Sequence, residues 1–317
     1  MSATDKRCVL VTGASGFVGK ALVPALASQG WRIRAASRQP IAAAGADITW
    51  APLPDLGRPT DWTHLLTGVD HVVHLAGIAH SRARLAEATY QRVNADASGE
   101  LARAAAASGV TKFVLISSVR AQCGPSADGA LSESATPAPS DAYGRSKQAA
   151  ERLVATEFPD ATLLRPVLIL GPGVKGNLAH LQGLARLRVP LPFGALRNRR
   201  SLLGLANMVS IIAFCLTSER ARGATYLAAD PEPMSLRDLV AAMRQALGRQ
   251  PWLVAVPPAL LATALTLAGR EALKTSLLGD LCVESSTLTA AGWRPVSTTR
   301  AEIFRMMAAA QSPPNSR

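Results

Sequence analysis

A tyrosine and a lysine four residues apart, Tyr143 and Lys147, form the pattern with the clearest chemistry in this chain. Both fall in a stretch that we predict to be helical, and residues four apart share one face of a helix. Free tyrosine has a pKa of about 10, and a nearby ammonium favours the phenolate. Tyr143 is therefore expected to act as an acid and base at neutral pH.

Two serines, Ser117 and Ser118, end the apolar run KFVLIS about 25 residues before the tyrosine. This run, Lys112–Ser117, is predicted to be a buried strand. A serine hydroxyl beside Tyr143 can bond a substrate oxygen as that oxygen gains or loses its proton. We predict Ser118, Tyr143 and Lys147 as the catalytic residues. A Y-x-x-x-K pair also arises by chance on surfaces, so the interpretation depends on its surroundings.

Three glycines, Gly13, Gly16 and Gly19, join a predicted strand over Lys6–Thr12 to a predicted helix over Phe17–Ser28. In such a loop one glycine allows a tight turn, one lets the backbone approach a pyrophosphate, and one lets helix and strand pack closely. The pyrophosphate would lie at the positive end of the helix. The position directly after an apolar strand is the context that a dinucleotide site requires.

The choice of dinucleotide depends on the end of the second predicted strand, Trp31–Ala35. An NAD site usually has an acidic residue there for the ribose 2′-hydroxyl. This chain has Ser37 and Arg38 instead, which suit a 2′-phosphate. We therefore expect NADP(H) rather than NAD(H), with a solvated loop arginine as the alternative for Arg38.

Strands and helices alternate along the first half of the chain. Further strands are predicted over Asp70–Leu75 and Ala161–Leu164, and further helices over Tyr90–Ser108 and Ala142–Glu157. This alternation is typical of an α/β fold, here a Rossmann-like, doubly wound parallel sheet.

The regular alternation of predicted strands and helices ends after Pro166, where glycines and prolines cluster. We predict a dinucleotide-binding domain over residues 1–166. A smaller, partly interleaved substrate-binding domain is predicted over 167–310, with a segment near 200–220 returning to the first domain. Residues 311–317 are expected to form a disordered tail.

Composition narrows the class of protein. The 317 residues are 48% hydrophobic, which is enough for a sizeable core, and the formal net charge is +12. The cations are scattered and aromatic residues make up only 4%, so we expect no nucleic-acid partner. The four cysteines lie far apart, so neither a metal site nor a disulfide framework is expected.

The amino-terminus shows no secretory leader, so a cytoplasmic location is expected. The apolar stretch Trp252–Ala268 contains Pro257 and Pro258 and is too short and broken for a stable membrane span. We interpret it as a buried or oligomer-facing helix, with contact to a membrane surface as the alternative.

The succession TGASGFVG, DHVVHLAG, NADASG, FVLISS, YGRSK and LLRPVLILGPG resembles the extended short-chain dehydrogenase/reductase family. These are the NAD(P)-dependent epimerases and dehydratases of nucleotide sugars. The resemblance is strong from about residue 8 to 210 and weak beyond. It implies the catalytic triad named above, and it implies cofactor contacts at Gly13, Ser15, Gly16, Phe17, Val18, Gly19, Arg38, Asp55, Leu56, Leu75, Ala76, Gly77, Asn94 and Pro166.

The same resemblance implies a UDP-sugar substrate and a homodimer paired through the long helices after residues 90 and 142. Asn177 matches a turn that meets the diphosphate, Phe193 a segment that covers the base, and Arg200 a phosphate clamp. Arginine can fork onto phosphate, although the loop around Arg200 could also be a solvated basic loop. His80 is placed to reach the sugar or to be an ordinary loop histidine.

The family's 4,6-dehydratases carry an Asp-Glu pair where this chain has Val119 and Arg120, so dehydration is not expected. The Ser37-Arg38 pair favours NADPH and hence reduction of a UDP-4-keto-6-deoxy-N-acetylhexosamine for surface polysaccharide. A UDP-glucose or UDP-N-acetylglucosamine 4-epimerase is the alternative, and a non-catalytic NAD(P)-binding protein of the same fold is the second alternative. Reductases of non-nucleotide carbonyls are disfavoured by Asn177 and Arg200.

Overall fold

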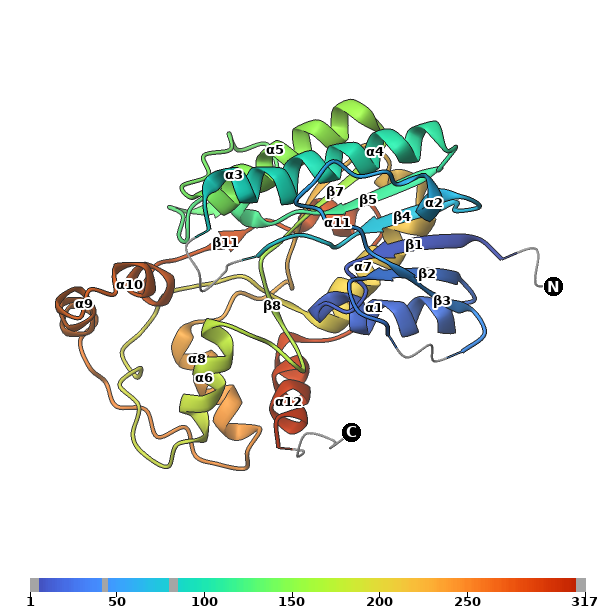
Figure 1. Ribbon diagram of the computed structural model, residues 1–317. Coiled ribbons are helices and arrows are strands. Elements are labelled where there is room, and N and C mark those ends of the chain that lie inside the picture. The colour runs from blue at the N-terminus through green and yellow to red at the C-terminus, as the bar shows by residue number, and fades with distance from the viewer. Residues whose placement is uncertain (1–5, 42–44, 80–84, 312–317) are drawn as a thin grey trace.

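Seven parallel strands form the central sheet of the computed structural model, which describes residues 6–41, 45–79 and 85–311 (Figure 1). Their order across the sheet is β10-β7-β5-β4-β1-β2-β3. The strands are β1 (Cys8–Thr12), β2 (Arg32–Ser37), β3 (Ile48–Pro52), β4 (His71–His74), β5 (Lys112–Ile116), β7 (Thr162–Pro166) and β10 (Thr225–Ala228). The predicted doubly wound α/β fold is confirmed.

The strand order creates one reversal of direction. The chain runs from β1 to β3 toward one edge and then crosses to β4 on the other side of β1. Such a switch point leaves a crevice outside the carboxyl ends of the strands, where ligands bind in open α/β sheets. The ends of β1, β4 and β5 are therefore where functional side chains are expected to gather.

Helices cover both faces of this sheet (Figure 1). α1 (Phe17–Ser28) and α7 (Leu205–Thr217) pack together on one face, and α4 (Ala97–Ala107) and α5 (Ala142–Glu157) on the other. Successive residues of a strand point to opposite faces, so Val9 and Val11 enter the core below α1, whereas Leu10 enters the core below α4.

The helix predicted over Tyr90–Ser108 is not uniform. It begins as α3 (Glu87–Tyr90), passes through a π-helical segment, Gln91–Asp96, and continues as α4. Insertions of this kind are rare and often occur at functional sites. Asn94 lies in the π-helical segment and is buried.

A third core lies in the smaller part of the molecule, between α6 (Asn177–Arg186), α8 (Leu236–Gln245) and α12 (Thr299–Ala309). The other elements of this part are α9 (Pro258–Leu267), α10 (Glu271–Leu278), α11 (Ser286–Ala290) and the short pairs β8 (Leu168–Leu170) with β9 (Leu202–Gly204) and β6 (Ala130–Leu131) with β11 (Cys282–Val283). The remaining short helix is α2 (Thr63–Leu66). The segment that returns to the sheet supplies α7 and β10. The domain boundary at residue 166 stays a prediction.

Three expectations concern the outside of the molecule. In the described part of the chain, no helix combines the length and the apolar character that a membrane crossing needs. From the sequence, residues 252–268 are interpreted as a buried or an oligomer-facing helix. The buried interpretation is wrong, because α9 buries none of its residues, whereas the oligomer-facing one stays a prediction. The predicted tail begins at Gln311, and residues 312–317 lie outside the described residues.

Candidate active site

The amino-terminal end of α5 carries Tyr143, and its N-cap residue determines how that end is held. Asp141 Oδ1 accepts a hydrogen bond from the Gly144 backbone N–H at 2.7 Å. The other carboxylate oxygen of Asp141 pairs with Arg120, which belongs to the turn after β5. An N-cap carboxylate satisfies a helix N–H that has no intrahelical partner. Asp141 therefore both starts α5 and ties it to the turn that carries Ser118.

Gly144 allows α5 to approach this turn very closely. A Cβ atom at residue 144 would lie 2.3 Å from the carbonyl oxygen of Arg120 and 3.0 Å from Cβ of Pro139. The first distance is well inside van der Waals contact, so only glycine fits without movement of the backbone. The close approach accompanies a hydrogen bond between the side chains of Tyr143 and Ser118.

Two opposing effects act on the pKa of Tyr143. Burial is the larger and raises the pKa above its ordinary value, whereas the hydrogen bond with Ser118 lowers it. The Ser118 hydroxyl is itself held by the turn, since it accepts the Arg120 backbone N–H at 3.2 Å. The ring of Tyr90 packs edge-on against that of Tyr143, with centroids 6.4 Å apart. The phenol is thus fixed in place and bonded to a second hydroxyl, as acid–base chemistry requires.

Lys147 lies buried one turn further along α5. Its Nζ donates a hydrogen bond at 2.7 Å to the carbonyl of Ile116, the last residue of β5. Desolvation lowers the pKa of Lys147 to about 8, while the carboxylate of Glu151 acts to raise it. The ammonium is therefore mainly charged at neutral pH and is anchored at the strand end beside Ser118.

A buried ion pair lies behind these residues. Glu151 pairs with Arg165 at 2.7 Å and accepts a hydrogen bond from the Ser117 hydroxyl at 2.5 Å. Arg165 also donates to Gln122 Oε1 at 3.1 Å. These contacts join β5, β7 and α5, the three elements around Ser118, Tyr143 and Lys147. Sequence reasoning missed this pair, although an acid four residues after Lys147 is visible in the sequence.

Glu151→Gln is expected to move the alkaline limb of the pH–rate profile to lower pH. The glutamine can still accept a hydrogen bond from Ser117, but it no longer supports the charge on Lys147. The pKa of Lys147 should fall below about 8, so the ammonium is lost at a lower pH. The measurement is kcat against pH, with Glu157→Gln on the same helix as the control, since Glu157 pairs with Arg103 near the surface. A uniform loss of activity with an unmoved limb would show that Glu151 is only structural.

The glycine loop has the geometry that the sequence predicts. Gly13 has φ of +71°, and a Cβ there would lie 2.8 Å from the Ala76 backbone nitrogen. A Cβ on Gly19 would lie 2.5 Å from the Gly13 carbonyl oxygen, so α1 packs directly on the loop. Gly16 is the N-cap of α1 and supplies no side-chain cap, and Ser15 beside it is exposed. This helix end can offer backbone N–H groups to a pyrophosphate, so the residues present fit a dinucleotide.

The predicted ribose-lining segment, residues 75–77, follows β4 and is tied to α5 through Asn94. The Asn94 side chain accepts the Ile78 N–H at 2.7 Å and donates to the Ile78 carbonyl and to Ser146 Oγ, both at 3.0 Å. Gly77 packs so closely on this amide that a Cβ would lie 2.8 Å from Asn94 Oδ1. Asn94 therefore positions the loop at the carboxyl end of β4.

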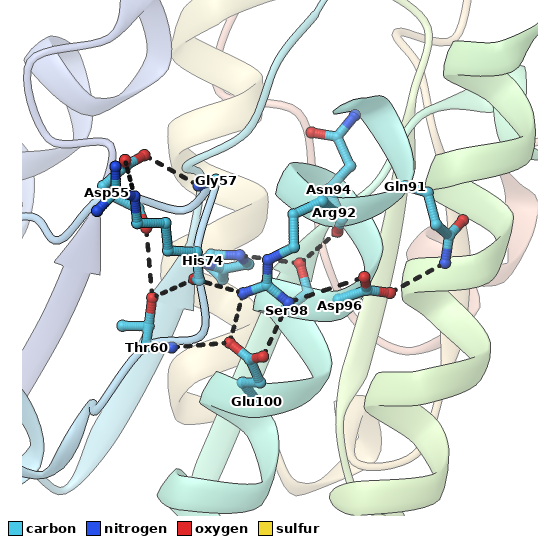
Figure 2. A network of polar contacts seen from close by, with 11 residues as sticks. Asp55, Gly57, Thr60, His74, Gln91, Arg92, Asn94, Asp96, Ser98 and Glu100 are labelled. Carbon is cyan, nitrogen blue, oxygen red and sulfur yellow. Dashed lines mark hydrogen bonds and ion pairs between the residues drawn. The ribbon is translucent and has the colours of Figure 1, made fainter. Parts of the chain in front are cut away.

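The predicted adenine turn at Asp55 and Leu56 is braced from the π-helical segment, as Figure 2 shows. Arg92 pairs with Glu100 at 2.6 Å and donates to the Arg58 carbonyl at 2.7 Å. Asp55 closes the turn by accepting the Gly57 N–H at 3.0 Å. The π-helical segment thus holds the turn through Arg92 and the ribose loop through Asn94.

A buried histidine, His74, lies at the end of β4 in the same region (Figure 2). Its two ring nitrogens lie 2.7 Å from Thr12 Oγ1 and 3.0 Å from Ser98 Oγ. Burial lowers the pKa of His74 to about 3, with the charge of Lys147 acting in the same direction. This neutral ring links β1, β4 and α4 and does not titrate near neutral pH.

The two residues that bear on cofactor choice have different surroundings. Ser37 is buried, and its hydroxyl donates to the Gln39 carbonyl at 2.6 Å and accepts from the Trp50 ring nitrogen at 3.1 Å. Arg38 is exposed one residue beyond β2, next to the glycine loop, where Ala14 N–H bonds the Ala36 carbonyl. Ser37 therefore serves the fold, whereas the Arg38 side chain remains exposed at the end of β2.

The predicted substrate residues are more dispersed. Asn177 is the exposed first residue of α6, whereas Phe193 is 9% exposed and packs in the core of the smaller part. Arg200 is half-buried and donates to the carbonyls of Gly279 at 2.8 Å and Pro125 at 3.0 Å. In this structure Arg200 thus closes a loop rather than presenting a free guanidinium. His80 lies outside the described residues, and Pro166 is the buried last residue of β7.

A comparison of the sequence with protein-family models identifies the family that these features indicate. The family model described as "NAD dependent epimerase/dehydratase family" matches residues 9–229. The chain belongs to this family. The match spans the glycine loop, Ser118, Tyr143, Lys147 and β10, so the resemblance to extended short-chain dehydrogenases is confirmed.

Individual relatives carry several activities. A UDP-glucose 4-epimerase from Vibrio cholerae is 31% identical over 98% of this chain and 97% of its own length. A ceramide reductase from Caulobacter vibrioides is 35% identical over 68% of this chain and 63% of its own. Among solved structures, MoeE5 in complex with UDP-glucuronic acid and NAD superposes with a TM-score of 0.74 at 23% identity, covering 95% of this chain and 98% of that one. Family membership and these relatives identify the chain as an NAD(P)-dependent enzyme.

Proposed function

We propose that the protein moves a hydride at C4 of a UDP-linked sugar and that its net reaction is 4-epimerisation. The hydrogen bond between Tyr143 and Ser118 at the carboxyl edge of the sheet carries this proposal, because it joins an acid–base group to a hydroxyl that can hold the same sugar oxygen. The Vibrio 4-epimerase, aligned over almost the whole of both chains, supports this reaction.

The nicotinamide, when bound, accepts and returns the hydride. Tyr143 takes the proton from the sugar C4 hydroxyl and later gives it back, and Ser118 bonds the same oxygen as its charge changes. Lys147 holds positive charge at the end of β5 through its bond to the Ile116 carbonyl, while Arg120 is the nearby cation that lowers the pKa of Tyr143. The glycine loop and the helix end at Gly16 orient the dinucleotide.

A 4-keto reductase is the second candidate, with a UDP-4-keto-6-deoxy-N-acetylhexosamine for surface polysaccharide as its substrate. Arg38 and the absence of an acidic residue at the end of β2 favour it, since a reductase draws on NADPH. The reductase from Caulobacter also supports this direction of hydride transfer.

One experiment distinguishes the two candidates. The purified protein is incubated in separate reactions with UDP-glucose, with UDP-N-acetylglucosamine, and with NADPH plus a UDP-4-keto-6-deoxy-N-acetylhexosamine. The products are separated by chromatography. The C4 epimer without net consumption of added dinucleotide supports the epimerase. Stoichiometric NADPH oxidation with the 4-keto-6-deoxy sugar, and no epimer, supports the reductase instead. Absence of both reactions would contradict the proposal.

We also propose that Arg38 binds a 2′-phosphate, so that NADP(H) is preferred. Arg38→Ala is expected to weaken NADPH binding by about 10–100-fold, the worth of a charge-assisted bond to phosphate, and to leave NADH binding nearly unchanged. The measurement is fluorescence titration with each nucleotide. Arg32→Ala, an exposed arginine at the opposite end of β2, is the control. Equal loss for both nucleotides would argue against a phosphate contact.

The quaternary structure and location belong to the same proposal. A homodimer would pair the outer faces of α4 and α5, which pack side by side on one face of the sheet. A cytoplasmic location fits nucleotide substrates. The mass of the protein in solution tests the dimer directly.

A further inference from the structure

The segment from Gln250 to Gly269 contains twenty consecutive residues without a charge. It includes α9, where Leu260 is 63% and Leu267 83% exposed. Figure 1 shows α9 at the outer edge of the smaller part, beyond α10 and away from the seven-stranded sheet. α9 packs on α10 and through Leu261 on the core of the smaller part, but most of its residues remain exposed. An apolar helix that is largely exposed marks a contact surface.

Trp252 starts this segment in a strained conformation. Its φ is +41°, and it is the one non-glycine residue in the described ranges with a positive φ. A bulky residue in this region costs free energy and persists only where its surroundings impose it. The indole is nevertheless 57% exposed, so the strain presents the ring to the outside rather than packing it in the core.

A buried cation holds Trp252 in this position. Arg244 is 2% exposed, and its guanidinium donates to the carbonyls of Pro251 and Trp252 at 2.8 and 3.1 Å. It also donates to the carbonyls of Leu187 and Val189 at 3.1 and 2.6 Å. Among the described contacts, four backbone carbonyls and no carboxylate accept hydrogen bonds from Arg244. Arg244 therefore joins the two loops, and no described carboxylate bonds its positive charge.

The two loops border an open cavity of about 390 Å³ whose charged lining residues are all arginines. It is lined by Leu187, Arg188, Arg244, Arg249, Gln250 and Trp252. Arg270 adds one net positive charge just beyond α9, because Lys274 is paired there with Glu271 at 2.7 Å. The surface therefore combines an exposed indole and an apolar helix with a basic, partly enclosed hollow.

We propose that this surface, Trp252 with the arginine-lined cavity and α9, docks on a membrane that contains anionic lipids. Tryptophan and leucine side chains enter the interface between headgroups and acyl chains. Arg188, which is exposed, and Arg249, which is partly exposed, receive lipid phosphates, whereas the buried Arg244 only holds the loops. A second copy of the chain fits less well, because a two-fold contact would bring one basic cavity against the other. The protein thus lies on the membrane without spanning it, and this inference does not depend on the proposed reaction.

Vesicle binding tests the proposal without any substrate. The full chain is expected to sediment with vesicles of phosphatidylcholine and phosphatidylglycerol and to stay in solution with phosphatidylcholine alone. Sedimentation should fall as salt is raised, because salt screens the arginines. Tryptophan emission should shift to the blue on binding, and Trp252→Phe should remove the shift although four other tryptophans remain. Equal binding to both vesicles, or none to either, would overturn the proposal.

A double variant distinguishes vesicle binding through this surface from nonspecific adsorption of the protein. Leu260→Glu with Leu267→Glu is expected to weaken vesicle binding by at least about tenfold, since it places two charges in the apolar interface. Val296→Glu is the matched control, because Val296 is 65% exposed and lies far along the chain from α9. Thermal unfolding checks that all variants fold. Unchanged vesicle binding in the double variant, or loss of a dimer in its place, would contradict membrane docking.

Discussion

Tyr143→Phe is expected to lower kcat by about a thousandfold or more while leaving cofactor affinity within about a factor of two. Removal of a positioned acid–base group costs about 10²–10⁴ in rate. The phenylalanine keeps the ring that packs against Tyr90 but loses the proton and the bond to Ser118. Steady-state turnover of the UDP-sugar and titration with the dinucleotide measure the two quantities.

Tyr226→Phe provides the comparison for this experiment. Tyr226 lies in β10, and its hydroxyl donates to the Arg220 carbonyl at 3.0 Å, so this variant loses one ordinary hydrogen bond away from the site. It should keep nearly full activity. Full activity in Tyr143→Phe would contradict the proposed catalytic role of Tyr143. A loss of cofactor affinity as large as the loss of kcat would show that Tyr143 mainly holds the dinucleotide.

The sequence predicted correctly those helices whose ends are determined by neighbouring residues in the chain. The bounds of α1 and α5 agree with the sequence-based prediction, because a glycine loop and an aspartate N-cap begin them. β3 was missed, since Ile48–Pro52 is short and lies at the sheet edge. The π-helical segment at Gln91–Asp96 was also missed. It accompanies bonds from Asn94 to residues 16 and 52 positions away in the chain, which periodicity does not report.

The candidate site shows the same division between local and distant contacts. Tyr143 and Lys147 were found because their spacing is itself the signal. Arg120, Asp141 and Glu151 were missed, since their roles come from ion pairs that form only after β5, α5 and β7 meet. The exposure of α9 could not be predicted either, because an apolar stretch reads the same whether neighbouring helices cover it or not.

Gly144→Ala is expected to reduce activity by about a hundredfold or more, although alanine is the better helix former by roughly 1 kcal/mol. The new Cβ would lie 2.3 Å from the Arg120 carbonyl oxygen, a backbone atom that cannot rotate away. Either α5 or the Ser118 turn must move, by roughly 1 Å, and a misplacement of that size can cost about 10² in rate. Such overpacking also costs about 1–3 kcal/mol of stability.

Gly183→Ala separates this steric effect from helix propensity. Gly183 lies inside α6, and a Cβ added there would meet nothing within 4 Å, so alanine should raise Tm slightly and leave kcat unchanged. Gly144→Ala should lower both, and the loss in kcat should exceed any change in cofactor affinity, because the glycine loop is untouched. If Gly144→Ala kept full activity, α5 could retreat without separating Tyr143 from Ser118, and the close approach of helix and turn would not be what positions the proton.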